Sequence, residues 1–507
     1  MQSVVDLISG LVWSPALIYL CLGAGLFFSV LTRFVQVRQF GEMIRLLRTG
    51  GSSERGISTF QALAVSLSGR VGTGNIAGVA AAIGFGGPGA VFWMWVVAFL
   101  GAATAYIESA LGQIYKEVDE GEYRGGPAFY FEKCLGQKWY GWLFAAMTII
   151  AVGLLLPGVQ SNAMANAAEV AFGPGQMMDL LGSEVSTTKL ITASIVVVIL
   201  GLIIFGGVKR IAGFTQVVVP GMAVAYILLA LVVIGMNLSQ LPGIVMLIVG
   251  DAFSPMAGFG AAIGWGVKRG VYSNEAGQGS GPHAAAAAEV DHPAQQGLVQ
   301  AFSVYVDTLF VCSATAFMIL ITGAYNVHGG DGGFLVQKLA ADVAANSPAF
   351  TQFALEGMFP GAGKVFVAVA LFFFAFTTIL AYYYVAETNV AYIRRSLSIP
   401  GSLLLLKFIL LGMVFYGSIR TADLAWALGD IGVGVMAWLN IVGILVIFLI
   451  GSPAIKALRD YERQQREGRA RFSFDPLALD IKGADFWAER KERASAETVK
   501  RPVSPNQ

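Results

Sequence analysis

The sequence predicts an all-α polytopic membrane protein with about eleven transmembrane helices. Of its 507 residues, 56% are hydrophobic and only 13% are charged, and the mean hydropathy is +0.67. A soluble protein of this length could not bury so much apolar surface. Two more observations refine the class: apolar runs recur at the length of a bilayer crossing, and two of these runs are interrupted by the same polar pattern.

Apolar runs long enough to cross a bilayer define the expected spans. The second and the seventh run contain glycines, an arginine and an asparagine in the middle, which disfavour one continuous helix. We therefore expect a broken helix at each of these two places. The expected spans are residues 14–36, 58–84, 88–115, 139–170, 187–207, 211–236, 252–288, 295–323, 361–393, 401–418 and 424–451.

Lysines and arginines gather in every second loop. The alternate loops carry only isolated cations such as Lys189, Lys338 and Arg420. Because cytoplasmic loops accumulate positive residues, this predicts a multi-pass protein of the cell membrane with its N-terminus outside and its C-terminus in the cytoplasm. Residues 14–35 lack the flanks of a cleaved signal and are expected to be a retained span. The clustered cations are Arg33, Arg38, Arg45, Arg48, Arg55, Lys116, Arg124, Lys133, Lys138, Lys209, Arg210, Arg394 and Arg395, followed by those of the tail.

The two interrupted spans repeat one pattern. Residues 70–78 and residues 269–277 carry Arg, Asn, Ala and Gly at the same offsets. Each break opens a set of five spans, and since five is odd the two sets have opposite topology. Inverted repeats of this kind are typical of secondary transporters, which bind substrate and ions at paired broken helices. Two unrelated glycine kinks at packing contacts are the alternative.

The repeat divides the chain into four parts. Residues 1–57 hold an extra N-terminal span and a basic loop, residues 58–249 the first five-helix repeat, residues 250–452 the second, and residues 453–507 a cytoplasmic tail. The connection 324–360 is expected outside, with a short helix near Phe334–Val343. The tail is expected to form a short helix followed by disorder.

Four segments resemble a known family. They are SLSGRVGTGNIAGVAAAIGFGGPGAVFWMWVVAFLGAATAYIES (66–109), YRGGPAFYF (123–131), GVKRGVYSNEAGQGSGP (266–282) and FFFAFTTILAYYYVAETN (372–389). With them the chain resembles the alanine or glycine:cation symporter family over nearly the whole membrane domain. The resemblance implies a leucine-transporter-type fold, five plus five inverted helices with one extra N-terminal helix, and uptake of small neutral amino acids with Na+, or in some members H+.

An amino-acid substrate needs donors for its carboxylate and acceptors for its ammonium group. Thr73, Gly74 and Asn75 lie where the second half of the broken span begins, so backbone N–H groups and the positive end of a half-helix suit the carboxylate. A structural hinge is the alternative. The ammonium group is expected at carbonyls freed near Gly264–Gly270. By the resemblance, Gln160 faces the substrate; an interhelical hydrogen bond is its other reading.

The resemblance also implies an ion site on the ninth span. It assigns Thr377 and Thr378 as Na+ ligands, together with carbonyls near Val65–Gly69, including Gly69, and it places Thr378 near the substrate. Na+ is a hard cation suited to neutral oxygens. Threonine hydroxyls in a helix can instead bond to the carbonyl four residues earlier.

Tyr382 follows Thr378 by one helical turn, at a position where relatives typically carry tryptophan. Because tyrosine is smaller and offers a hydroxyl, the resemblance implies that this chain accepts a larger neutral amino acid, such as glutamine or serine, besides alanine and glycine. The alternative is ordinary packing within an aromatic-rich helix.

Charged residues inside the spans are expensive and invite a functional interpretation. We expect Arg70, Arg269 and Glu275 to form gates or structural pairs rather than to touch the substrate, and Glu275 is the natural proton site if H+ replaces Na+. Glu108, Asp307 and Glu387 could join such ion pairs, and the alternative is that they lie near the inner or outer boundary and pair for packing.

Several other functions are disfavoured. The spans carry no catalytic motif, no nucleotide-binding loop and no metal-ligand spacing beyond a site for Na+, so an enzyme, an ATP-driven pump and a resident cofactor are not expected. A channel would need a ring of like residues around an axis. The net charge of +1 offers nothing to nucleic acid. The expected partners are a small neutral amino acid, Na+ and the lipid bilayer. H+-coupled symport and amino-acid exchange remain the alternatives.

Overall fold

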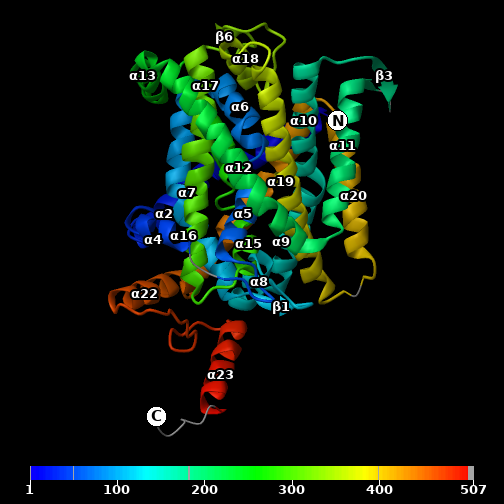
Figure 1. The fold of residues 1–507 in the computed structure, drawn as a ribbon. Coiled ribbons are helices and arrows are strands. Elements are labelled where there is room, and N and C mark those ends of the chain that lie inside the picture. Colours follow the sequence, from blue (N-terminus) through cyan, green and yellow to red (C-terminus); the bar gives the residue numbers. More distant parts are fainter. Residues whose placement is uncertain (1, 49–50, 181–182, 398, 501–507) are drawn as a thin grey trace, which may run out of the picture.

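The computed structural model describes residues 2–48, 51–180, 183–397 and 399–500, and it is a bundle of long helices (Figure 1). Within these residues, eight helical segments are long and apolar enough to cross a membrane. The uninterrupted helices of the bundle are α1 (Gln2–Val12), α2 (Pro15–Leu31), α7 (Gly89–Ile114), α11 (Thr187–Ile204), α12 (Gly207–Met236), α19 (Gly363–Arg394), α20 (Ser402–Ser418) and α21 (Ala422–Ile450).

Both expected breaks are present. The first half of the second span is α5 (Thr59–Arg70), which begins at a capping box between Ser58 and Gln61. It is followed by the 3₁₀ turn η1 (Thr73–Asn75) and by α6 (Ala77–Gly86). The seventh span consists of α14 (Phe259–Asn274) and α15 (Gly281–Ala287). Between them Gly277 and Gly279 have φ of +85° and +82°, a conformation that favours glycine.

Two other helices contain a π-helical segment. One is η2 (Ala151–Leu155), which joins α9 (Lys138–Ile150) to α10 (Leu156–Phe172). The other is η4 (Tyr305–Cys312), which joins α16 (Pro293–Val304) to α17 (Ser313–Thr322). Segments of π-helix are rare and occur frequently at functional sites.

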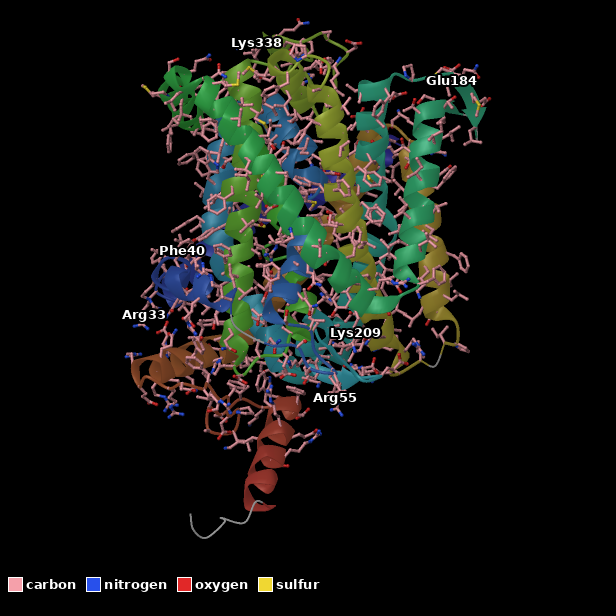
Figure 2. All side chains as sticks on the ribbon, viewed as in Figure 1. Arg33, Phe40, Arg55, Glu184, Lys209 and Lys338 are labelled. Atoms are coloured by element: carbon pink, nitrogen blue, oxygen red, sulfur yellow. The ribbon has the colours of Figure 1, made fainter. Side chains whose placement is uncertain are left out.

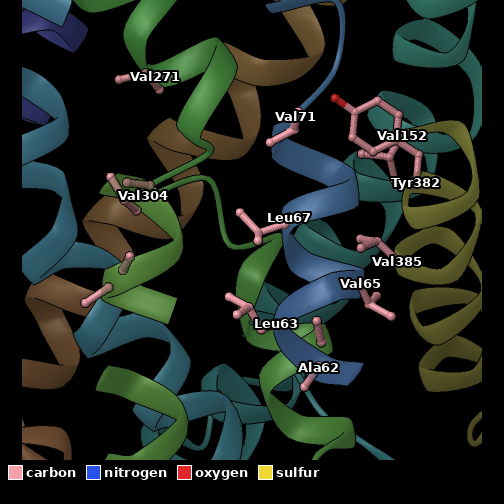
Figure 3. Close-up of a cluster of buried hydrophobic side chains, with 14 of the residues drawn as sticks. Ala62, Leu63, Val65, Leu67, Val71, Val152, Val271, Val304, Tyr382 and Val385 are labelled. Carbon is pink, nitrogen blue, oxygen red and sulfur yellow. The ribbon is translucent and has the colours of Figure 1, made fainter. Parts of the chain in front are cut away.

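The half-helix α5 lies in the middle of the bundle, with ten of its twelve residues buried. Figure 3 shows Leu63 and Leu67 on one side of α5, and Val65 on the other side toward Val385 of α19. Apolar side chains therefore pack on two opposite sides of α5, and its polar end at Arg70 lies at the centre of the protein.

The expected helix near Phe334–Val343 is wrong. Strand β5 (Asn326–His328) pairs with β6 (Phe334–Gln337), in which partly buried and exposed residues alternate, and the helix of this connection is α18 (Ala349–Met358). The alternation has the period of a strand, which the sequence interpretation overlooked. An unexpected helix, α13 (Leu241–Phe253), precedes the second break; its Asp251 accepts a hydrogen bond from the Gly89 amide at 2.7 Å.

One end of the bundle carries most of the clustered cations, and we call it the basic face. Figure 2 shows Arg33, Arg55 and Lys209 toward this end, and Glu184 and Lys338 at the opposite end. Helices α22 (Pro453–Arg466) and α23 (Asp485–Lys500) lie beneath the basic face in Figure 1. The expected disorder of the tail is therefore wrong for residues 453–493, where Tyr461 and Trp487 are buried. The remaining elements are α3 (Val35–Arg38), α4 (Phe40–Leu46), β1 (Glu117–Asp119), β2 (Glu122–Arg124), α8 (Pro127–Leu135), β3 (Met177–Leu180), β4 (Ser183–Ser186) and η3 (Leu238–Gln240).

Candidate substrate and ion site

The break after α5 passes closely between two other helices at Gly72. A β-carbon at this position would lie 2.4 Å from Thr378 Oγ1 of α19 and 3.0 Å from Gln160 Oε1 of α10. Only glycine fits without displacing these groups. The neighbouring amide of Thr73 donates to Gln160 Oε1 at 3.0 Å. The structure therefore brings Thr73, Gln160 and Thr378 together around one backbone position.

The hydroxyl of Thr378 faces the carbonyls that α5 leaves free at its end. It lies 2.8 Å from the Ser68 oxygen and 3.4 Å from the Val71 oxygen, and 2.9 Å from the Phe374 oxygen of its own helix. Neutral oxygens from two chain segments thus converge at one point. This donor set has the chemistry that a hard monovalent cation requires.

The Thr377 side chain does not share this position. The Thr377 hydroxyl lies 2.9 Å from the Phe373 oxygen and 3.1 Å from the Phe374 oxygen, both in its own helix. A β-carbon on Gly69 would lie 3.2 Å from Glu275 Oε2, so Gly69 allows the two broken helices to approach each other. Neither residue contributes a side-chain oxygen to the convergence at Thr378.

Within η1, Asn75 and Gly74 hold the break in shape. The Asn75 side chain accepts from the Gly72 amide at 2.8 Å and donates to Asp307 Oδ1 at 2.6 Å. Gly74 packs so closely on α14 that a β-carbon would lie 3.1 Å from Ser273 Cα. Thr73 Oγ1 is buried, and no protein group among the described residues hydrogen-bonds to it.

Asp307 was expected either in an ion pair or near a membrane boundary, and its hydrogen bonds are instead to neutral groups. It is fully buried in η4 between the two breaks. Its carboxylate accepts from Asn75 of the first break, from Ser273 of the second at 3.0 Å, and from Thr308 at 2.7 Å. Its place in the middle of an apolar span marks Asp307 as a functional candidate from the sequence, whereas its partners are visible only in the structure.

Glu108, for which the same two alternatives were open, lies against the second break. Its carboxylate accepts from the amides of Gly277 and Gly279 at 3.2 and 3.1 Å, and from Asn440 at 2.7 Å. Glu108 therefore fixes the unwound segment between α14 and α15. Glu387 differs from the other two carboxylates, because it lies 4.0 Å from Arg124 of β2 at the basic face.

The three charges expected to form gates have separate partners. Arg269 forms a bidentate pair with Asp430 at 2.8 and 3.1 Å, and its guanidinium lies 4.3 Å from the centre of the Trp426 ring. Arg70 is buried and donates to the Gln300 carbonyl at 3.0 Å and to the Ser303 hydroxyl. The Glu275 carboxylate instead accepts from Ser280, at 2.6 Å.

Tyr382 lies on the basic-face side of the break. It is 2% exposed, and its hydroxyl faces the Glu275 carboxylate. The two residues line a cavity of about 10 Å³ together with Gly69 and Ser280. The carbonyls of residues 264–270, expected free for an ammonium group, belong to the continuous helix α14 instead. The C-terminal end of α14, at Asn274, is the nearest corresponding feature.

Comparison with known proteins gives consistent matches over the whole membrane domain. The model of the sodium:alanine symporter family matches residues 1–475. YrbD of Bacillus subtilis (strain 168) is 56% identical over 96% of this chain and 98% of its own length. Its name describes it as a sodium/proton-dependent alanine carrier protein whose function is inferred. The sodium/proton-dependent alanine carrier protein of Bacillus sp. (strain PS3) is 46% identical over 89% of this chain and 98% of the relative. The sodium/alanine symporter AgcS of Methanococcus maripaludis is 36% identical over 91% and 98%, respectively.

Proposed function

The chain belongs to the sodium:alanine symporter family, and we propose that it couples the inward movement of Na+ to the uptake of a small neutral amino acid of the alanine or glycine class. The observation that carries this proposal is the meeting of Thr73, Gln160 and Thr378 at the break after α5. The protein is a multi-pass membrane transporter and not an enzyme.

In the proposed binding mode, the substrate carboxylate replaces Gln160 Oε1 at the Thr73 amide. The buried Thr73 hydroxyl supplies a second donor. The positive end of a half-helix adds to the attraction of a negative group. The ammonium group faces the C-terminal end of α14, where the helix dipole is negative. Gly72 and Gly74 allow the backbone to approach the ligand.

The coupling ion is proposed to bind between Thr378 and the carbonyls of Ser68 and Val71. One cation would thereby tie α19 to the end of α5, beside the substrate. Thr377 is not proposed as an ion ligand, because its hydroxyl is hydrogen-bonded within its own helix, and it is used as the control for Thr378. Asp307 is proposed as a second acceptor of positive charge, because its buried carboxylate accepts from neutral groups, Asn75 and Ser273 of the two breaks and its neighbour Thr308.

We place the basic face in the cytoplasm, following the distribution of lysines and arginines. The five-plus-five inverted repeat is supported by two breaks at matching sequence positions. In this arrangement Arg269 and Asp430 close the outer side of the site, and Glu275 with Tyr382 closes the inner side. Tyr382 is proposed to leave room for a substrate larger than alanine, such as serine or glutamine.

Uptake into proteoliposomes tests the proposal. A panel of labelled amino acids is offered with a Na+ gradient, with a proton gradient, and with neither. Accumulation of alanine or glycine driven by the Na+ gradient supports the proposal. Accumulation that follows the proton gradient alone would show that H+ is the coupling ion, and a buried carboxylate, Glu275 or Asp307, would then carry the proton. Exchange of internal for external amino acid without any gradient would identify an exchanger.

A further inference from the structure

The tail of the chain is held against the basic face by buried charges. On α22, the Glu462 side chain is only 5% exposed and pairs with Arg33 at 2.8 Å and Arg38 at 2.5 Å. Two residues before it, Asp460 accepts from His292 at 3.2 Å. Both carboxylates are buried, although Arg33 and Arg38 remain partly exposed, and removal of their partners would leave a buried charge uncompensated. Helix α22 therefore has one defined position under the bundle.

Helix α23 is anchored separately, beyond residue 475 where the match to the family model ends. The Trp487 indole is 2% exposed and donates to the Gln113 carbonyl next to the end of α7, at 2.9 Å. Arg490 donates to the Val290 carbonyl at 2.8 Å and pairs with Glu289 at 3.0 Å. A helix that packed loosely on the surface would not bury a tryptophan in this way.

The segment around Glu289 and Val290, which α23 contacts, also joins the two broken helices at the basic face. Ile57, which leads into α5, forms a parallel β-bridge with Ala288, which ends α15. The Ile57 amide donates to the Ala287 carbonyl at 3.0 Å, and the Glu289 amide donates to the Ile57 carbonyl at 2.9 Å. These bonds must break if the ends of α5 and α15 are to separate.

A second contact links α23 to the approach of α5. The ring of Phe486 packs edge-to-face on Tyr123 with centroids 5.1 Å apart. The Tyr123 amide donates to the Arg55 carbonyl at 3.1 Å, and its hydroxyl donates to Glu289 at 2.7 Å. The tail thus contacts both partners of the bridge, directly at residues 289–290 and through Tyr123 at residue 55.

We propose that residues 453–493 form a latch that holds the inner ends of α5 and α15 together and slows the opening of the transport pathway toward the basic face. Residues 476–493 are the part of the latch that lies beyond the match to the family model, which ends at residue 475. The proposal rests on the proposed function only for its effect on transport. The docking and its effect on the Ile57–Ala288 bridge are independent of any substrate.

Hydrogen–deuterium exchange on the full-length protein tests the latch. Trp487→Ala removes the indole bond to Gln113 and the buried ring, and Arg490→Gln weakens the contacts to Glu289 and Val290. Leu477→Ala is the matched control, because this tail side chain is 74% exposed. Both latch variants should raise exchange about tenfold in residues 484–493 and also in residues 55–58 and 285–290. The control should leave all three segments unchanged.

Uptake by the same variants gives the second readout. With the latch weakened, the maximal uptake rate should rise severalfold while the KM for alanine and the ion dependence stay as in the natural chain. Increased exchange confined to residues 484–493, with residues 55–58 and 285–290 and the uptake rate unchanged, would overturn the latch. Increased exchange at the bridge in a protein that takes up no amino acid under any gradient would uphold the latch and overturn the proposed function.

Discussion

An alanine at position 72 would place a methyl group 2.4 Å from Thr378 Oγ1 and 3.0 Å from Gln160 Oε1. Ordinary contacts begin at 3.4 Å, so the Thr378 side chain or the backbone must move by about 1 Å, and overpacking of this size costs about 1–3 kcal/mol. The movement would pull Thr378 from the Ser68 carbonyl and displace the neighbouring Thr73 amide, at which the substrate carboxylate is proposed to bind. We therefore expect Gly72→Ala to weaken alanine binding by roughly 5- to 150-fold.

Calorimetric titration of the purified protein with alanine, in the presence of Na+, measures this effect. Gly78→Ala is the matched control, since a β-carbon there would have its nearest neighbour at 3.7 Å, in Trp426. The control should bind alanine within about twofold of the natural chain. If Gly72→Ala binds as tightly as Gly78→Ala, the crowding at Gly72 has no bearing on the substrate site and the reasoning fails.

Four other perturbations follow from the same structure. Asp307→Asn keeps the shape of the side chain but removes its charge, so uptake should lose part of its dependence on the ion gradient. An unchanged dependence on the ion would show that Asp307 has no coupling role. Tyr382→Trp should shift competition in uptake toward alanine and glycine, and an identical profile would show that Tyr382 does not set the size of the pocket. Asp430→Ala removes the partner of Lys268 and Arg269 and should destabilise the closed outer side by about 3–5 kcal/mol. The expected result is faster quenching of tryptophan fluorescence by iodide. Quenching equal to that of the natural chain would contradict a closing role. Burial lowers the pKa of Lys116 to about 7, with Glu289 and Arg490 as its charged neighbours, and burial also lowers the pKa of His292. If docking of the latch buries these bases, it releases protons and should strengthen by up to about tenfold per unit as the pH rises above about 7. Protease cleavage within 484–493 should then fall with rising pH and lose this trend in Lys116→Met.

Much of the architecture could be predicted from the sequence, because it follows from the length and composition of the apolar runs. Apolar runs of bilayer length gave the long helices, and the glycine-rich polar centres gave both breaks. The strand pair at β5–β6 and the ordered tail were missed for a common reason. Short amphipathic segments are specified by what they pack against, and the partners of Trp487 lie more than three hundred residues away in the chain.

The site was partly predictable. Thr73, Gln160 and Thr378 converge as residues of an expected break and of two helices that the resemblance placed beside it. For Asp307 and Glu108 the sequence left an ion pair and a boundary position open, because a carboxylate in an apolar run has no partner in sequence that reveals its depth. The direction in which a threonine hydroxyl points also depends on its neighbours in space. Thr378 reaches the end of α5, whereas Thr377 bonds within its own helix.

The most direct test of the joint substrate and ion site is the Na+ dependence of alanine affinity in three proteins: the natural chain, Thr378→Ala and Thr377→Ala. Because Thr378 alone of this pair faces the Ser68 and Val71 carbonyls, Na+ should tighten alanine binding in the natural chain and in Thr377→Ala, and should have no effect in Thr378→Ala. Alanine binding that Na+ still tightens to the same extent in Thr378→Ala would contradict the site at the break after α5.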